Sequence, residues 1–233
     1  VRVMSNKGRL YIVATPIGNL KDFTFRAIDI LQEVDHIFAE DTRTSITLMK
    51  HYNITTNLDS YHEHNKTQKI PKIIKLLNEG KNIGLISDAG TPTISDPGYK
   101  LIRACIDEEI NIIPIPGASA VTAALSASGL PSDSFFFLGF LPQKKGRKKK
   151  ISFLKSLENT IIIFESPHRL LKTLRELHDE LGERPIIVAR ELTKLYEEII
   201  RGNFNSVIEF FESKKVKGEI VIIIGKDDDR IYF

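Results

Sequence analysis

The sequence contains only one cysteine, Cys105, in 233 residues. One cysteine cannot form an internal disulfide bond, so a secreted, disulfide-stabilised class is disfavoured and a reducing, cytoplasmic location is expected. Cys105 lies in an apolar helical pattern. This pattern indicates a buried, inert thiol rather than a nucleophile.

Long hydrophobic runs are also missing. No apolar stretch approaches the roughly 18 residues that a membrane-spanning helix requires. Residues 1–10 are polar and basic, with no apolar signal core behind them, so export is not expected. With 42% hydrophobic and 27% charged residues, the chain has a globular composition and is long enough for one large domain or two modest ones.

Two common nucleotide-binding signatures are absent as well. No G-x-G-x-x-G follows the first predicted strand and no P-loop occurs, which disfavours a typical dinucleotide fold or NTPase. His62 and His64 flank Glu63, but no further histidine lies at ligand spacing and cysteine is almost absent. No metal site is therefore expected.

The net charge of +3 conceals a local concentration of positive charge. Without the six basic residues of segment 144–150, 27 Lys and Arg face 30 Asp and Glu, which leaves −3. We expect this segment to be a loop. Its like charges repel one another unless an anion is present, so they indicate phosphate binding, although a solvated loop would show the same pattern. The basic residues are Lys144, Lys145, Arg147, Lys148, Lys149 and Lys150.

Short apolar strands alternate with amphipathic helices in the first half of the chain. Strands are expected at 10–14, 36–39, 83–86 and 112–115, and helices at 25–32, 42–52, 67–78 and 99–108. Strands that are separated by helices favour right-handed crossovers and a mainly parallel sheet.

The pattern changes at 114–117, where two prolines and a glycine interrupt it. Expected next are a small-residue helix at 118–128, strands at 135–139, 160–164, 186–190, 197–201 and 220–224, a helix at 167–181 and a short helix between the last two strands. The larger share of strands favours a mixed sheet. The sequence therefore predicts an α/β protein of two domains, 1–115 and 116–233.

Several predicted strands are followed by segments that could bind a ligand, because ligands of α/β sheets bind beyond the carboxyl ends of the strands. Segments 15–20, 88–92 and 116–120 together suggest a shared crevice, although each alone could be an ordinary turn. Gly90 permits close backbone approach, and Asp88 offers a carboxylate to hydroxyls or an amine.

Acidic and basic residues stand together at the ends of some predicted strands, and they allow two interpretations. Glu40, Asp41 and Arg43 could orient a polar substrate, but the local pattern favours Asp41 as the N-cap of the next helix. In segment 164–169, Ser166 is expected to cap a helix that begins at Pro167.

Seven short segments, taken in sequence order, resemble the motifs of a known protein family. They are LYIVATPIGNL (10–20), AEDTR (39–43), YHEHN (61–65), SDAGTP (87–92), PGASA (116–120), FESPHR (164–169) and RELTK (190–194). Each string is moderately specific, and the ordered set is highly specific. The chain resembles the tetrapyrrole methylase superfamily, in its ribosomal RNA branch.

The resemblance implies a class III methyltransferase fold of two α/β domains, with S-adenosylmethionine in the cleft between them, and a homodimer. Small-molecule members carry a glycine-rich loop where this chain has 15–20, which argues for RNA. His168 and Arg169 would meet the RNA together with the basic segment. The implied cofactor residues are Pro16, Asp88, Ala89, Gly90, Ile94, Ser119, Ala120, Phe164 and Leu192.

The resemblance further implies 2′-O-methylation of a cytidine ribose in the decoding region of 16S ribosomal RNA, either free or in the assembled 30S subunit. A positioned base would accelerate attack by the weakly acidic hydroxyl by roughly 10²–10⁴-fold. Cationic groups could stabilise the developing oxyanion. The candidate bases are Glu40, Asp41, His62 and His64, and the candidate cations are Arg43 and Lys194.

Two alternatives remain open from the sequence. A methyltransferase for a tetrapyrrole-like small molecule would use the same cofactor loops but would leave segment 144–150 without a role. A non-catalytic RNA-binding module is disfavoured, because the RNP strings of an RRM and the GXXG of a KH domain are absent.

Overall fold

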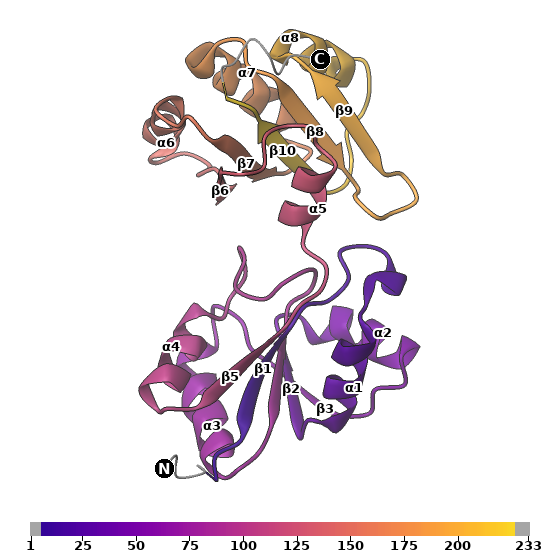
Figure 1. Ribbon diagram of the computed structural model, residues 1–233, viewed down its shortest axis with the longest axis vertical. Coiled ribbons are helices and arrows are strands. Elements are labelled where there is room, and N and C mark those ends of the chain that lie inside the picture. Colours follow the sequence, from indigo (N-terminus) through magenta and orange to yellow (C-terminus); the bar gives the residue numbers. More distant parts are fainter. Residues whose placement is uncertain (1–5, 227–233) are drawn as a thin grey trace. The chain divides into compact units, whose positions relative to one another are not determined.

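The computed structural model describes residues 6–226; residues 1–5, which belong to the polar N-terminal stretch, and 227–233 lie outside this range. The chain divides into two units, Val1–Ser119 and Ala120–Phe233, four residues beyond the predicted boundary (Figure 1). Within the described range, no helix is long and apolar enough to cross a membrane.

The first unit is built on a five-stranded sheet with the order β3-β2-β4-β1-β5. All neighbouring strands in it are parallel, which confirms the predicted parallel sheet. The strands are β1 (Arg9–Val13), β2 (His36–Ala39), β3 (Asn57–Ser60), β4 (Ile83–Ile86) and β5 (Asn111–Ile115). The helices are η1 (Leu20–Asp22, 3₁₀), α1 (Phe25–Glu33), α2 (Thr42–His51), α3 (Lys66–Asn78) and α4 (Tyr99–Asp107).

Helices cover both faces of this sheet (Figure 1). On one face α1 and α2 pack around Leu31 and Ile37, and on the other α3 and α4 pack around Ile73 and Leu101. Strand β4 is therefore buried along its whole length. A Cβ on Gly84 would lie 2.8 Å from Leu31 Cδ2, so the glycine lets α1 approach the central strand.

Strand β3 is not predicted by the sequence pattern. Its four residues, Asn57–Ser60, carry no apolar alternation because β3 is an edge strand that pairs only with β2. Asp59 of β3 accepts hydrogen bonds from Lys69 at 2.6 Å and from Lys72 at 2.8 Å, both on α3. These ion pairs attach the polar edge to a helix.

The second unit contains a sheet of five strands in the order β6-β7-β10-β8-β9. Strands β6 and β7 are parallel and all other pairs are antiparallel, which confirms the predicted mixed sheet. The strands are β6 (Phe135–Phe140), β7 (Thr160–Glu165), β8 (Ile186–Arg190), β9 (Glu198–Gly202) and β10 (Ile220–Ile224). The helices are α5 (Ala120–Ser126), α6 (Arg147–Lys155), α7 (Leu170–Leu181) and α8 (Phe204–Glu212).

The prediction that segment 144–150 is a loop is wrong, because α6 begins at Arg147. Arg147, Ile151 and Leu154 are buried at helical spacing, so one face of α6 packs into the core while its lysines remain outside. The high charge of the segment hides this weak apolar periodicity.

The predicted start of the helix after β7 is also wrong. Helix α7 begins at Leu170, and its N-cap is Arg169, not Ser166. Residues 167–169 form a turn instead, closed by the Arg169 backbone N–H, which donates to Ser166 O at 3.1 Å.

Candidate functional site

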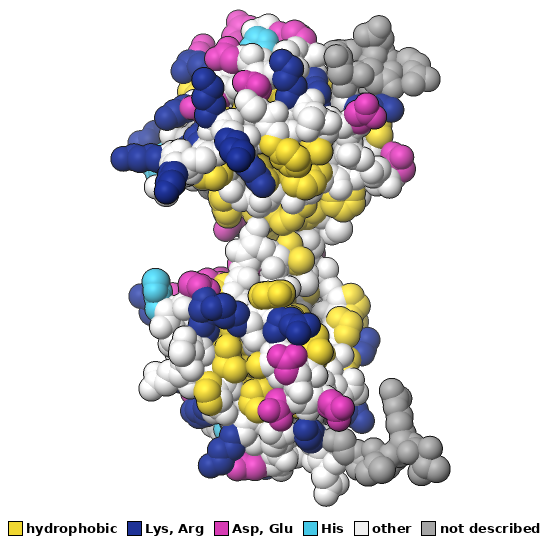
Figure 2. Space-filling view, turned by 90° about the vertical axis from the view of Figure 1, so that its left-hand side faces the viewer, with side chains coloured by type: hydrophobic (Ala, Val, Ile, Leu, Met, Phe, Trp, Pro, Cys, Tyr) yellow, Lys and Arg dark blue, Asp and Glu magenta, His cyan; other side chains and the backbone are white. Residues whose placement is uncertain are grey.

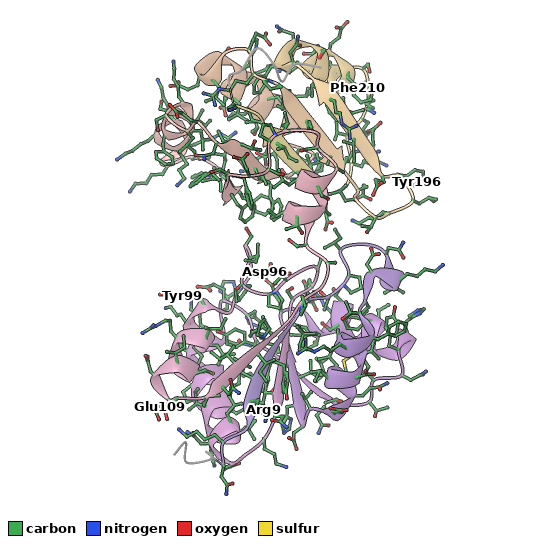
Figure 3. All side chains as sticks on the ribbon, in the orientation of Figure 1. Arg9, Asp96, Tyr99, Glu109, Tyr196 and Phe210 are labelled. Carbon is green, nitrogen blue, oxygen red and sulfur yellow. The ribbon has the colours of Figure 1, made fainter. Side chains whose placement is uncertain are left out.

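The carboxyl ends of the parallel strands in the first unit meet at one edge of its sheet. Asp96, between β4 and α4, lies at this edge, whereas Arg9 and Glu109, near the amino ends of β1 and β5, lie at the opposite one (Figure 3). Ligands of parallel α/β sheets bind at the edge where the strands end, so the loops at the Asp96 end form the candidate site.

Three predicted cofactor loops are hydrogen-bonded to one another at this edge. Thr15, after β1, and Gly90, after β4, exchange backbone hydrogen bonds of 2.8 and 3.0 Å. The Thr91 hydroxyl donates to Ala118 O, after β5, at 3.2 Å. The structure therefore brings the segments after β1, β4 and β5 together in one surface.

The predicted cofactor residues of this unit differ in their accessibility. Asp88, Ala89 and Ile94 are exposed, whereas Pro16 is buried. Gly90 has a φ of +84°, in the left-handed region that favours glycine. The loop thus exposes Asp88 and Ala89 to a ligand, while the hydrogen bonds between Gly90 and Thr15 hold it in place.

Four carboxylates gather at the same edge, from Glu40, Asp41, Asp88 and Asp96. Asp88 Oδ1 accepts a hydrogen bond from the Asp41 backbone N–H at 2.9 Å, which links the ends of β4 and β2. Burial, and then the neighbouring carboxylates, raise the pKa of Glu40. Burial also raises the pKa of Asp96 to about 6, with the Ser87 hydroxyl opposing and the Asp88 charge adding to the rise. Raised carboxyl pKa values are frequent where protons are transferred.

Asp41 and Arg43 form a separate pair. Asp41 accepts a hydrogen bond from the Arg43 backbone N–H at 2.8 Å, which confirms that Asp41 caps α2, and the Arg43 guanidinium approaches the carboxylate to 2.6 Å. These contacts with Arg43 lower the pKa of Asp41 to about 2. Asp41 is therefore a weak base, and the Arg43 side chain is exposed.

His62 and His64 follow β3, with ring centroids 6.0 Å apart. His64 is exposed, while His62 is half-buried and its Nδ1 has no hydrogen-bond partner among the described residues. No group of three or more His, Cys, Asp or Glu in residues 6–226 is arranged to hold a metal ion.

In the second unit, the carboxyl ends of β6, β7 and β8 share one edge, since β7 and β8 both run antiparallel to β10. Phe164, at the end of β7, is half-buried, and its ring centroid lies 4.9 Å from that of Phe137 and 5.7 Å from that of Phe140. Phe140 is 56% exposed, so the three rings present an aromatic surface. Leu192, beyond β8, is buried.

Two features, one in each unit, are not predicted by the sequence. Asp96 stands in a turn-rich segment, and only its burial beside Asp88 distinguishes it from other acidic residues. Phe140 belongs to a run of apolar residues that reads uniformly as core, and the residue pattern gives no sign that its ring is exposed.

The candidate cation Lys194 lies between β8 and β9. Its Nζ donates to Glu191 Oε1 at 2.9 Å and to Glu219 Oε2 at 3.0 Å. Burial disfavours its charge, but the hydrogen bonds to the two glutamates outweigh burial and raise the pKa of Lys194. Lys194 therefore remains protonated and suits the role of a cation rather than of a base.

The basic residues of segment 144–150 divide into exposed and buried groups. Figure 2 shows Lys and Arg side chains gathered on one side of the second unit, next to hydrophobic side chains. Lys150 is half-buried, with Nζ 5.5 Å from the Phe153 ring centroid, and the Arg147 side chain is only 8% exposed. The exposed members are Lys144, Lys145, Lys148 and Lys149.

The remaining predicted residues lie at the ends of α7 and α5. His168 is exposed, whereas the guanidinium of Arg169 is paired with Glu165. Ser119 is the last residue of the first unit and Ala120 the first of the second, where α5 begins; both are half-buried.

Comparison with known proteins gives matches along nearly the whole chain. The profile of the family described as Tetrapyrrole (Corrin/Porphyrin) Methylases matches residues 9–208. A ribosomal RNA small subunit methyltransferase I of Halalkalibacterium halodurans is 50% identical over 227 residues, which cover 97% of this chain and 78% of that protein. A protein of the same name from Thermotoga maritima is 47% identical over 221 residues, which cover 94% of this chain and 100% of that protein.

Solved structures of low sequence identity share the fold. A diphthine synthase has a TM-score of 0.75 at 12% identity, over 96% of this chain and 92% of that chain. Uroporphyrin-III C-methyl transferase from Thermus thermophilus, complexed with S-adenyl homocysteine, has a TM-score of 0.65 at 16% identity, over 94% of this chain and 97% of that chain. Both likenesses concern the fold alone.

Replacing Asp96 by Asn tests the carboxylate environment. The raised folded-state pKa means that Asp96 stabilises the fold below its ordinary pKa of 3.8 and that this contribution is lost as the pH rises through about 6. Asparagine stays neutral, so Asp96→Asn is expected to increase the free energy of unfolding at pH 7.5 by on the order of 1 kcal/mol, after allowance for solvent screening. The gain should fade towards pH 4.

Urea unfolding of both proteins at several pH values measures this difference. Asp107→Asn, at an exposed position of α4, is the control and should change the free energy of unfolding by less than about 0.5 kcal/mol. A loss of stability in Asp96→Asn at pH 7.5 would contradict the assigned environment.

Proposed function

Because the chain belongs to the tetrapyrrole methylase family and, within it, to the ribosomal RNA small subunit methyltransferases I, we propose that it methylates the 2′-hydroxyl of a cytidine ribose in the decoding region of 16S ribosomal RNA. The observation that carries the proposal is the likeness, along nearly the whole chain, to relatives with that name. The reaction is a methyl transfer from S-adenosylmethionine.

The residues at the two strand edges fit this donor. S-adenosylmethionine, when bound, supplies a methyl group on a positively charged sulfur. In the first unit, the exposed Asp88 can accept hydrogen bonds from hydroxyls or an amine, beside the exposed Ala89. In the second unit, the half-buried Phe164 offers its ring to an apolar or aromatic group.

We assign the donor to residues of both units. Ser119 and Ala120 stand where the units join, so they can meet a molecule held by either. Ile94 and Leu192 would add apolar contacts from the loops after β4 and β8. Alignment of the reacting atoms is the main contribution expected from these contacts.

Glu40 is the strongest candidate base among the four that the sequence leaves open. Its pKa is raised, so its carboxylate holds a proton more readily than an ordinary glutamate. Asp41 has the opposite shift and is held by Arg43. His62 and His64 lie at the same edge of the sheet and could help to orient the ribose.

Cations complete the proposed chemistry. Lys194 remains protonated between Glu191 and Glu219 and can stabilise negative charge that develops on the ribose oxygen. Arg43 is exposed at the edge of the first sheet and could contact a phosphate or the same oxygen.

The RNA contacts are assigned to exposed side chains of the second unit. Lysines bind phosphates without reading sequence, so they hold the RNA rather than select the nucleotide. The proposed contacts are Lys144, Lys145, Lys148, Lys149 and His168. The proposed partner is the small-subunit ribosomal RNA, free or in the 30S subunit. From the family resemblance we further propose that the protein is a homodimer and is located in the cytoplasm.

Mass-spectrometric mapping of ribosomal RNA tests the function directly. RNA from cells that have this protein should carry a 2′-O-methyl group on one cytidine of the decoding region, and RNA from cells without it should lack that group. Purified protein with S-adenosylmethionine should restore the group on free RNA or on 30S subunits. An unchanged methylation pattern would refute the proposal.

Glu40→Gln tests the base. The amide cannot accept the proton, so single-turnover methyl transfer with saturating RNA should slow by roughly 10²–10⁴-fold. The wild-type rate should rise with pH through the raised pKa of Glu40, and this rise should vanish in the variant. Asp41→Asn keeps an oxygen that can cap α2 and should retain a rate within about tenfold of wild type. A wild-type rate in Glu40→Gln would remove Glu40 from the mechanism.

Neutralising Lys148 and Lys149 tests the RNA contacts. The double variant Lys148→Gln/Lys149→Gln should bind RNA more weakly, with a salt dependence reduced by roughly 0.7 in log–log slope for each lost contact to a single strand. Low salt should restore activity, because it strengthens the contacts that remain. Lys215→Gln/Lys217→Gln, also exposed in the second unit, is the matched control. Equal salt slopes in both variants would contradict the assignment.

A further inference from the structure

A buried network of charged side chains connects the basic segment with the end of strand β7. We infer that Glu165, Thr173 and Arg147 act as positioning residues that hold the RNA-binding lysines in place, and that Arg147 itself does not touch RNA. The inference rests on the proposed function, since it concerns how that function's RNA contacts are held.

Glu165 is the centre of this network. Its side chain is fully buried, and its carboxylate accepts hydrogen bonds from the Ser166 backbone N–H at 2.7 Å and from Arg169 Nε at 2.7 Å. Its second oxygen accepts a hydrogen bond from the Thr173 hydroxyl at 2.7 Å. A buried carboxylate requires such partners, so Glu165 fixes all three groups around the end of β7.

Thr173 connects Glu165 to Arg147 through hydrogen bonds of its hydroxyl group. The Thr173 side chain lies fully buried on α7, and while its hydroxyl donates to Glu165 it accepts a hydrogen bond from Arg147 Nη2 at 2.7 Å. Arg147 Nε donates to Glu176 Oε2 at 2.7 Å, and Nη1 donates to Pro142 O at 3.1 Å. All three guanidinium nitrogens are thus engaged by the protein, and the Arg147 side chain is only 8% exposed, so little of it is accessible to a phosphate.

Two successive backbone carbonyls at the start of the basic segment are held by this network. Arg147 Nη1 donates to Pro142 O, and Arg169 Nη1 donates to Leu141 O at 3.2 Å. Lys144 and Lys145 follow these carbonyls, and the backbone of Arg147 starts the helix that presents the next lysines. Lys144 and Lys145 therefore lie in a turn that is held at both ends, and Lys148 and Lys149 lie in the first turn of α6, which follows it.

The chemistry of the network favours a positioning role over a purely stabilising one. It contains two arginines and two glutamates, with Arg147 and Glu165 buried, and buried ion pairs often stabilise a fold no better than apolar residues of similar volume. What it provides is a defined geometry. The lysines are fixed relative to Phe164, the neighbour of Glu165 and a proposed cofactor contact, so a phosphate bound by them has a set position relative to that ring.

Thr173→Val tests this inference because it removes the hydroxyl while it keeps the shape of the side chain. Hydrogen–deuterium exchange should become at least tenfold faster in residues 143–149, and the KM for RNA should rise at least tenfold. The dissociation constant for S-adenosylmethionine, measured by calorimetry, should stay within twofold of wild type. Thr173→Ser retains the hydroxyl, so its hydrogen–deuterium exchange in residues 143–149 and its KM for RNA should be close to those of wild type.

Arg147→Lys is a second test. Lysine keeps the positive charge but cannot make all three contacts, so faster exchange in residues 143–149 and a higher KM for RNA are again expected. Unchanged exchange in residues 143–149 of both variants would overturn the inference, and so would faster exchange with an unchanged KM for RNA. If wild-type protein methylated no ribosomal RNA, the proposed function would fail, while the exchange measurement would still show whether the network holds the segment.

Discussion

The two hydrogen bonds between Thr15 and Gly90 are the contact on which the candidate site depends. Strands β1 and β4 are parallel neighbours, and their loops would diverge beyond the sheet without a further link. Gly90 can make the link because it adopts a positive φ at no steric cost. The link keeps Asp88 and Ala89 outward while the chain that carries them stays joined to the core. The loop is hydrogen-bonded at its base and exposed at its tip, which suits a pre-organised binding surface.

The same edge explains the uneven charge states of its carboxylates. Asp41 lies beside Arg43 and remains ionised, whereas Glu40 and Asp96 are partly buried among like charges and hold protons more tightly. One short stretch of backbone therefore presents a fixed anion next to a group that can exchange a proton. Such separation of neighbouring pKa values is a common way to divide roles between two carboxyl groups.

Much of the fold could be predicted from the sequence because helix and strand periodicities are strong where both sheet faces are covered. Strand β4 is an example, with four residues that are all buried. Strand β3 could not be predicted from periodicity, because an edge strand needs no apolar alternation. Helix α6 was hidden because its charge outweighs the two apolar residues, Ile151 and Leu154, that anchor it.

The candidate site was predictable in part, for similar reasons. Loops that follow strands can be recognised by position, so the contact between segments 15–20 and 88–92 has a sequence signature. The burial of a single side chain has no such signature in the sequence. Asp96 and Arg147 look like ordinary charged residues in the sequence, and only packing distinguishes the first as desolvated and the second as enclosed.

The polar composition of β3 has a consequence for how the molecule behaves in a crowded solution. The open edge of a sheet offers unpaired backbone groups to any other extended chain, and flat apolar edges promote aggregation. Strand β3 ends its sheet with Asn57–Ser60, and Lys69 and Lys72 stand beside it through their ion pairs with Asp59. A second strand that docked there would meet polar and charged side chains instead of an apolar surface. The polar character that conceals β3 in the sequence, where Leu58 is its single apolar residue, thus protects the sheet from growing into a neighbouring molecule.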